Sequence, residues 1–249
     1  MTEGYARPSP AEVADRVVAS RRDRDLVRLE GAHALKHALR FGADIEVVAT
    51  DDLDGLLALL GSLAPDVLET VAARAVELDQ DRWRCVVPRT LPSPAVAVAR
   101  RPVVGVDEVL AARGRCLVLD RPRHLGNLGA AIRVAAAAGA GGVLVLGTAD
   151  PWHPTAVRAA AGLQFAVPTV RVDELPLTAR SIVALDPVGT PLHEQPLPVD
   201  ALLLVGTERG GLDPHLRARA DEHRSIEMRP GVSSLNLATA VAVALYADR

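Results

Sequence analysis

Cysteine, lysine and aromatic residues are scarce in this chain of 249 residues. Its 2 cysteines, Cys85 and Cys116, lie in separate apolar runs, and neither belongs to a CxxC pair or to a pattern with metal-ligand spacing. The sequence therefore excludes a disulfide framework and a cysteine-based zinc site, and we expect both thiols to be buried. Lys36 is the sole lysine, so arginine supplies nearly all of the positive charge.

Long apolar runs are absent as well. No run is long enough to cross a bilayer, and the first residues, MTEGYARPSPAEVADR, are polar and acidic where a secretory signal would be basic and then apolar. We therefore expect a cytoplasmic protein without a membrane partner. The formal net charge of −3 argues against a protein that coats nucleic acid nonspecifically, because neutralising phosphates takes an excess of basic residues.

The residues that are present suffice for a well-packed core. Hydrophobic residues make up 49% of the chain and charged residues 24%, which is typical of globular proteins. The first hundred residues alternate between helical stretches and short β-like runs, which predicts a small α/β module. The prolines that follow indicate a boundary or an extended linker, over residues 88–102. We therefore expect two domains, at residues 1–100 and 101–249.

The second half has a regular alternation of apolar runs and helical segments. From Cys116 onward, runs such as GVLVLG and ALLLVG are separated by segments such as NLGAAIRVAAAA, and SIEM is the last run before the helical SLNLATAVAVALY. Alternation of this kind predicts an α/β fold with a parallel sheet between two layers of helices. Continuously apolar strands agree with it, since such a sheet is buried on both faces.

Glycine-bearing loops follow three of these strands. In LDRPRHLGNLGAAIRV a strand ends at Asp120, Gly126 and Gly129 would let the backbone approach a bound group, and Asn127 is a candidate helix cap. The glycine spacing is GxxG rather than GxGxxG, which is weak evidence for any ligand and leaves a dinucleotide-binding fold open. The other two loops follow Gly206 and Met228. Loops at the carboxyl ends of parallel strands can converge on one site.

Together these three segments resemble the three motifs of the SpoU (TrmH) family, the 2′-O-ribose RNA methyltransferases of the SPOUT superfamily. The first motif is read in Asn127-x-Gly129-x-x-x-Arg133, the second in the GTERGGL segment that begins at Gly206, and the third in Ile226-x-Met228 followed by Ser234-Leu235-Asn236. In addition, LEGAHALKHALRFGADIEVV resembles the start of the family's ribosomal L30e-like substrate-binding domain, and AVRAAAGLQFAVP its segment between the first two motifs.

Some positions depart from the family pattern. His124-Leu125 stands where Asp-Pro is common, Arg209 where glycine is frequent, and Glu227 where proline is frequent. These positions bear on the choice of target rather than on the chemistry.

The resemblance implies a fold and a cofactor. The family fold is a deep trefoil knot, an exception to the rule that chains avoid knots, and the threaded helix here would be residues 234–246. Family members pair through the knotted domain, so a homodimer is expected. S-adenosylmethionine lies bent in the family's pocket and is held largely by backbone groups, and the matching cofactor-binding positions are Gly206, Thr207, Ile226, Met228 and Leu235.

The resemblance also implies catalytic residues. Arg133 would activate the ribose 2′-hydroxyl, although an arginine serves as a base only if its guanidinium is strongly perturbed or the substrate assists, and the alternative is phosphate positioning. Asn127 would orient Arg133 or the ribose. Glu208 would hold Asn127 or Arg133 by charge-assisted hydrogen bonds, with an ordinary surface carboxylate as the alternative. Ser234 and Asn236 would support the ribose and the cofactor loop, with ordinary helix caps as the alternative.

RNA is the expected partner, ribosomal RNA before transfer RNA. A basic cluster near the N-terminus could meet RNA or be a solvated face; its members are Arg21, Arg22, Arg24, Arg28 and Arg40. Aromatic residues make up only 2% of the chain, so contacts to RNA shape, phosphate and 2′-hydroxyl groups should dominate over base stacking. No metal is expected, because His33 and His37 lack the glutamate of a zinc protease helix. The alternative function is a non-catalytic RNA-binding or ribosome-assembly protein of the same fold.

Overall fold

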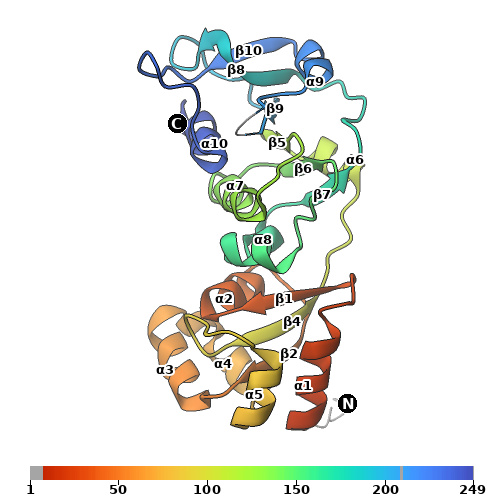
Figure 1. The fold of residues 1–249 in the computed structure, drawn as a ribbon, viewed down its shortest axis with the longest axis vertical. Helices are drawn as coiled ribbons and strands as arrows, with labels where there is room; N and C mark the ends of the chain where they lie inside the picture. Colours follow the sequence, from red (N-terminus) through yellow and green to blue (C-terminus); the bar gives the residue numbers. More distant parts are fainter. Residues whose placement is uncertain (1–7, 208–209, 249) are drawn as a thin grey trace. The chain divides into compact units, whose positions relative to one another are not determined.

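The computed structural model describes residues 8–207 and 210–248 (Figure 1). The chain divides into two compact units, Met1–Pro102 and Val103–Arg249, called the first and the second unit below. Within the described ranges, no helix has both the length and the apolar character that crossing a membrane requires.

The first unit is a small mixed sheet with helices. Its strands lie in the order β1-β4-β2-β3, with β4 antiparallel to both of its neighbours and β3 parallel to β2. The strands are β1 (Leu26–Glu30), β2 (Ile45–Thr50), β3 (Ala75–Glu77) and β4 (Val96–Arg100). The helices are α1 (Pro10–Ala19), α2 (Ala32–Arg40), α3 (Leu53–Leu63), α4 (Pro65–Arg74) and α5 (Gln80–Val86).

One expectation for the first unit holds in part and one is wrong. The proline-rich segment ends at the boundary between the two units, as expected, but it is not an extended linker, because it contains β4, whose residues 96–99 are buried between two strands. The expectation that Cys85 is buried is wrong, because most of the run WRCVV is the end of α5, in which Val86 is buried and Cys85 is exposed. Alternation of exposure along a helix explains the error, since only one side of α5 faces the core. Cys116 is buried, as expected.

The arginine cluster near the N-terminus is not one free basic face. Arg28 is buried and ion-paired with Glu30, and Arg40 pairs with Asp66. Arg21 donates hydrogen bonds to two main-chain carbonyl oxygens of α5. Much of the positive charge that the sequence offers here is therefore used within the unit itself.

The second unit confirms the prediction of a parallel sheet with helices on both faces. All neighbouring strands of its six-stranded sheet are parallel, in the order β10-β8-β9-β5-β6-β7. The strands are β5 (Cys116–Leu119), β6 (Gly142–Leu146), β7 (Thr169–Val172), β8 (Ile182–Pro191), β9 (Leu202–Val205) and β10 (Glu222–Ser225). The helices are α6 (Val106–Ala111), α7 (Leu125–Ala137), α8 (Pro154–Ala159), α9 (Pro214–Ala218) and α10 (Leu237–Tyr246), with a short 3-10 helix at Leu163–Ala166.

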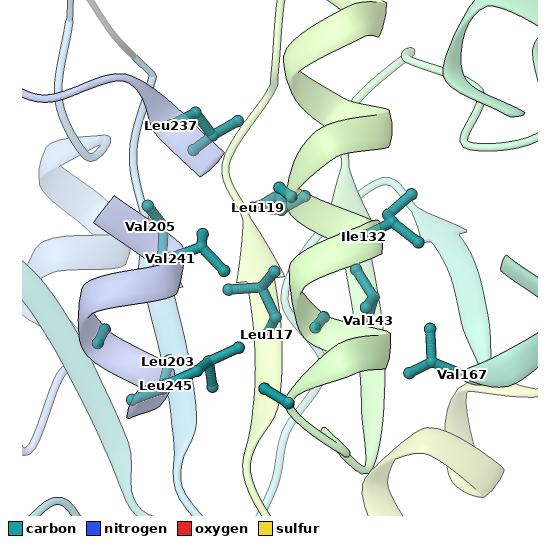
Figure 2. Close-up of a cluster of buried hydrophobic side chains, with 14 of the residues drawn as sticks. Leu117, Leu119, Ile132, Val143, Val167, Leu203, Val205, Leu237, Val241 and Leu245 are labelled. Atoms are coloured by element: carbon teal, nitrogen blue, oxygen red, sulfur yellow. The ribbon is translucent and has the colours of Figure 1, made fainter. Parts of the chain in front are cut away.

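The central strands β5, β6 and β9 are buried on both faces. Leu117 and Leu119 of β5 point into a cluster with α7, α8 and α10, whereas Cys116 and Val118 point into a second cluster on the opposite face, which α6 and α9 cover. Figure 2 shows the first cluster, where Val241 of α10 lies beside the strand residues. Successive residues of these strands thus alternate between two apolar layers, which explains their continuously apolar sequences.

The last strand is displaced from the predicted position. We expected it at SIEM, but β10 is Glu222–Ser225, and Ile226 and Met228 follow it. The strand lies at the edge of the sheet beside β8, where Arg224 is buried against Glu222 and the Ser225 hydroxyl donates to a carbonyl oxygen of β8. Because a polar edge strand carries no apolar run, the sequence pattern pointed to the wrong residues.

Helix α7 begins earlier than expected and packs closely on α8. It starts at Leu125, so Asn127 lies in its first turn and does not cap it. A Cβ atom added to Gly129 would lie 2.2 Å from the carbonyl oxygen of Ala156 in α8, whereas one added to Gly126 would meet nothing within 4 Å. Gly129 therefore serves the contact between two helices and not, as expected, the approach of a ligand.

An arginine next to β5 holds the far end of α10. The Arg115 guanidinium donates to the Asp248 carboxylate, with Nη1 to Oδ1 at 2.7 Å, and to the carbonyl oxygens of Leu197 and Pro198. The side chain of Arg115 is only 13% exposed, so this ion pair is shielded from water. The pairing lowers the pKa of Asp248 below its ordinary value.

The trefoil knot and the L30e-like character of the first unit stay predictions.

The close packing of α7 on α8 gives a testable prediction. Gly129→Ala should destabilise the second unit by about 1–3 kcal/mol, because the new methyl group must push the two helices apart. Gly126→Ala, three residues earlier in the same helix, should be neutral or stabilising by up to about 1 kcal/mol, since alanine favours helix more than glycine does. Urea denaturation followed by circular dichroism measures both. Equal effects of the two substitutions would contradict the packing role of Gly129.

Candidate functional site

A cavity of about 330 Å³ lies at the carboxyl end of β9. We call it the β9 cavity. Every predicted cofactor-binding position lines it: Gly206 and Thr207 after β9, Ile226 and Met228 after β10, and Leu235 before α10. Ser233, Ser234 and three residues of β8, Leu185 to Pro187, complete most of the wall. The second and third loops therefore converge on one hollow.

The described ends of the loop after β9, Gly206–Thr207 and Gly211, lie close together. Thr207 and Gly211 exchange two backbone hydrogen bonds, each of 3.1 Å, and Gly211 adopts a positive φ of 64°. A Cβ atom at Gly206 would lie 2.2 Å from the carbonyl carbon of Gly211, so no other residue fits there without opening the loop. Glycine thus lets two stretches of backbone close on each other and border the cavity with main-chain groups.

The first and third motifs meet through two asparagines. Asn236 Oδ1 accepts a hydrogen bond from the backbone N–H of Ala238, which confirms Asn236 as the cap of α10. Its Nδ2 donates to Oδ1 of Asn127 in the first turn of α7, at 3.2 Å. Because Leu235 next to it lines the β9 cavity, this contact places Asn127 near the cavity's rim.

The structure does not bring the remaining predicted catalytic residues into the Asn127–Asn236 contact. Arg133 is exposed on α7, six residues after Asn127, which is about 120° around a helix and about 9 Å along it. Among the residues that the structure describes, its side chain has no hydrogen bond or ion pair. Ser234 lines the cavity but begins no helix, since α10 starts at Leu237. Glu208 and Arg209 lie outside the described residues.

A second cavity, of about 850 Å³, borders the same loop from the side of β5. Sequence reasoning missed the ion pairs that form its wall. Arg121 takes a positive φ of 44° and pairs with Asp120 and with Asp213, while the backbone N–H of Asp213 donates to Asp120. The pairing raises the pKa of Arg121 and lowers that of Asp213. The first loop is thereby fastened to the end of the second.

Asp186 of β8 was also missed. It lines the β9 cavity, its side chain is only 7% exposed, and its Oδ1 accepts a hydrogen bond of 3.1 Å from the backbone of Val188. Its Oδ2 pairs with Arg217 of α9 and lies 3.5 Å from Nδ1 of His223. The only signal in the sequence was an acidic residue at the end of the apolar run IVALD.

Metal-binding geometry is not found in the described part of the chain, where no group of three or more His, Cys, Asp or Glu residues could hold an ion. Any ligand of the β9 cavity would instead meet main-chain groups, uncharged side chains and the carboxylate of Asp186. That suits an organic molecule bound largely through the backbone.

Comparison with known proteins decides the family. The model of the SpoU rRNA Methylase family matches residues 114–246, more than half of the chain and nearly all of the second unit. The chain belongs to the SpoU rRNA methylase family. The predicted resemblance is therefore confirmed.

Individual relatives cover most of both chains. The chain is 30% identical over 227 residues to the 23S rRNA (guanosine(2553)-2′-O)-methyltransferase RlmP of Bacillus subtilis, spanning 88% of this chain and 86% of that protein. It is 32% identical over 203 residues to the 23S rRNA (uridine(2479)-2′-O)-methyltransferase of Streptomyces viridochromogenes, spanning 75% and 71%. The crystal structure of the SpoU methyltransferase AviRb from Streptomyces viridochromogenes, in complex with AdoMet, matches with a TM-score of 0.75 and 27% identity over 94% of this chain and 95% of that one.

Substitutions of Asn236 can separate its role as the cap of α10 from its hydrogen bond to Asn127. Asn236→Ala should destabilise the second unit by about 1 kcal/mol, because α10 loses its cap. Asn236→Asp keeps an acceptor for the Ala238 N–H and removes the donor to Asn127, so its stability should stay near that of the wild type. Urea denaturation compares the three proteins. If the aspartate variant is as unstable as the alanine variant, the contact with Asn127 outweighs the cap.

Proposed function

We propose that this chain transfers a methyl group from S-adenosylmethionine to a ribose 2′-hydroxyl of ribosomal RNA. Membership of the SpoU rRNA methylase family supports this, as do the names of relatives that cover most of the chain. Ribosomal RNA is favoured over transfer RNA because both of these relatives are named for 23S rRNA. The observation that carries the proposal is the convergence of the second and third motifs on the β9 cavity.

The β9 cavity fits such a cofactor. Its volume of about 330 Å³ lies within the range of about 300–1,000 Å³ typical of small-molecule sites. Gly206 and Thr207 would hold the cofactor from one side, and Ile226, Met228 and Leu235 from the other. The cofactor supplies a methyl group made electrophilic by a positively charged sulfur. The paired backbone of Thr207 and Gly211 offers preformed groups beside the cavity, so little ordering is needed there on binding.

The ribose that accepts the methyl group would be bound next to the cavity by the asparagine pair, Asn127 and Asn236. Amide groups of Asn127 and Asn236 can both donate and accept, so they suit the orientation of a ribose whose hydroxyls do the same. Orienting the hydroxyl at near-attack distance accounts for a large part of such a reaction's acceleration. Ser234 can add a further hydroxyl at the cavity wall. In our proposal Arg133 either shares the hydroxyl proton or positions a phosphate, and Glu208 supports it.

The proposed enzyme acts as a homodimer. Arg133 lies on a different side of α7 from the Asn127–Asn236 contact, so we infer that it serves the site of a second copy. Exposed apolar side chains on α10, Val243 and Tyr246, support pairing through the second unit. A trefoil knot in that unit and RNA binding by an L30e-like first unit belong to the same proposal.

The function is tested by incubating the protein with ribosomal RNA and S-adenosylmethionine that carries a labelled methyl group. The wild type should incorporate label at a 2′-hydroxyl, which nucleotide mapping would locate. Arg133→Ala should abolish incorporation without lowering stability, because the side chain is exposed and makes no bond among the described residues. Arg113→Ala, which removes another exposed arginine, is the control. Binding of RNA without any incorporation would support the non-catalytic alternative instead.

The shared site is tested by mixing two inactive chains. Gly206→Ala should disrupt the cofactor loop, since its methyl group has no room, and Arg133→Ala removes the arginine. In dimers with one chain of each kind, one site would combine an intact loop with an intact arginine. Equal co-expression should therefore restore about a quarter of wild-type incorporation. No recovery, with mixed dimers present, would mean that Arg133 serves its own chain.

A further inference from the structure

The β9 cavity has one charged side chain among the described residues of its wall. Asp186 is surrounded there by glycine, serine, threonine and apolar residues. Its carboxylate is 7% exposed, so water screens it weakly, and a buried charge acts over the whole of a small cavity. Neither the family motifs nor the backbone contacts proposed above give this residue a role.

Neighbouring groups fix the Asp186 carboxylate in place but do not fully neutralise its charge. Val188 donates its backbone N–H to Oδ1, and Arg217 and His223 approach Oδ2. Arg217 lies on α9 with 48% of its side chain exposed, so its charge is partly screened by solvent. The negative charge of this ion pair lies on the buried side, at the cavity, and the screened positive charge lies on the outer side. The cavity therefore has a net attraction for cations.

We propose that Asp186 makes the β9 cavity select the cationic cofactor S-adenosylmethionine over its neutral-sulfur product, S-adenosylhomocysteine. This inference rests on the proposed function and names a residue that sets the specificity of its cofactor site. The two molecules share the adenosine, the ammonium and the carboxylate groups, and differ by a methyl group and one positive charge on sulfur. A fixed carboxylate therefore lowers the free energy of the cofactor complex more than that of the product complex.

The charge of Asp186 acts differently on the cofactor and on the product during turnover. Methyl transfer removes the positive charge from sulfur, so the attraction to Asp186 falls at the step that forms the product. The cavity then holds the product less firmly than the cofactor that replaces it. Asp186 is a specificity residue in this account and takes no part in moving the methyl group.

Isothermal titration calorimetry at neutral pH tests the inference without any RNA. The measured quantity is the ratio of the Kd of S-adenosylhomocysteine to the Kd of S-adenosylmethionine. In Asp186→Asn the ratio should fall at least about threefold from the wild-type value, because the amide keeps the shape and loses the charge. Sinefungin, which carries an ammonium group in place of the methylated sulfur, should lose affinity together with S-adenosylmethionine.

A second substitution predicts the opposite change. Arg217→Gln removes the compensating charge and leaves the carboxylate in place, so the same ratio should rise at least about twofold. Because Arg217 is exposed, this variant remains informative even if Asp186→Asn does not fold. Arg113→Gln removes an exposed arginine at the opposite end of β5 and should leave the ratio unchanged.

The outcomes separate the inference from the proposed function. A lower ratio in Asp186→Asn and a higher one in Arg217→Gln support the role of Asp186. If the wild type binds S-adenosylmethionine but neither substitution changes the ratio, this inference fails and the proposed function stands. If the wild type binds neither molecule, both fail.

Discussion

Burial of the second unit's sheet on both faces determines where its chemistry can occur. The strands β5 and β9 lie side by side in register, Cys116 opposite Leu202 and Leu119 opposite Val205, and their side chains fill two apolar layers. No polar side chain can be presented from the middle of such strands without a large cost of desolvation. Polar groups and free backbone are therefore concentrated where the strands end, and the loops after β9 and β10 form the cavity wall there.

The same constraint explains why so much of the site is main chain. The loop after β9 folds back on itself through the paired hydrogen bonds of Thr207 and Gly211, and Gly206 is forced to lack a side chain. The first motif reaches this region through Asn127, which contacts Asn236 across the gap between α7 and α10. Ion pairs of Arg121 fasten the turn before α7 to the start of α9. Three loops become one site because each is bonded to another.

Local patterns predicted the parts of this arrangement that depend on a single segment. Apolar runs identified β5, β6 and β9, and the helical segments NLGAAIRVAAAA and SLNLATAVAVALY identified α7 and α10. Patterns failed where tertiary contacts override propensity. Glu222 and Arg224 form an edge strand because β8 pairs with them, and Arg28 is buried because Glu30 lies beside it. Likewise Gly129 is required by α8, and Asp186 faces the cavity because of strands that are distant in sequence.

The hydrogen bond between Asn127 and Asn236 joins residues that are 109 positions apart. Closing a loop of that length costs conformational entropy, which is recovered only after the intervening strands have paired and packed. The contact between Asn127 and Asn236 therefore depends on the assembled sheet and not on either loop alone. Ligand affinity should then report on the integrity of the whole unit, since the contact is kept only while the strands between its two residues stay packed.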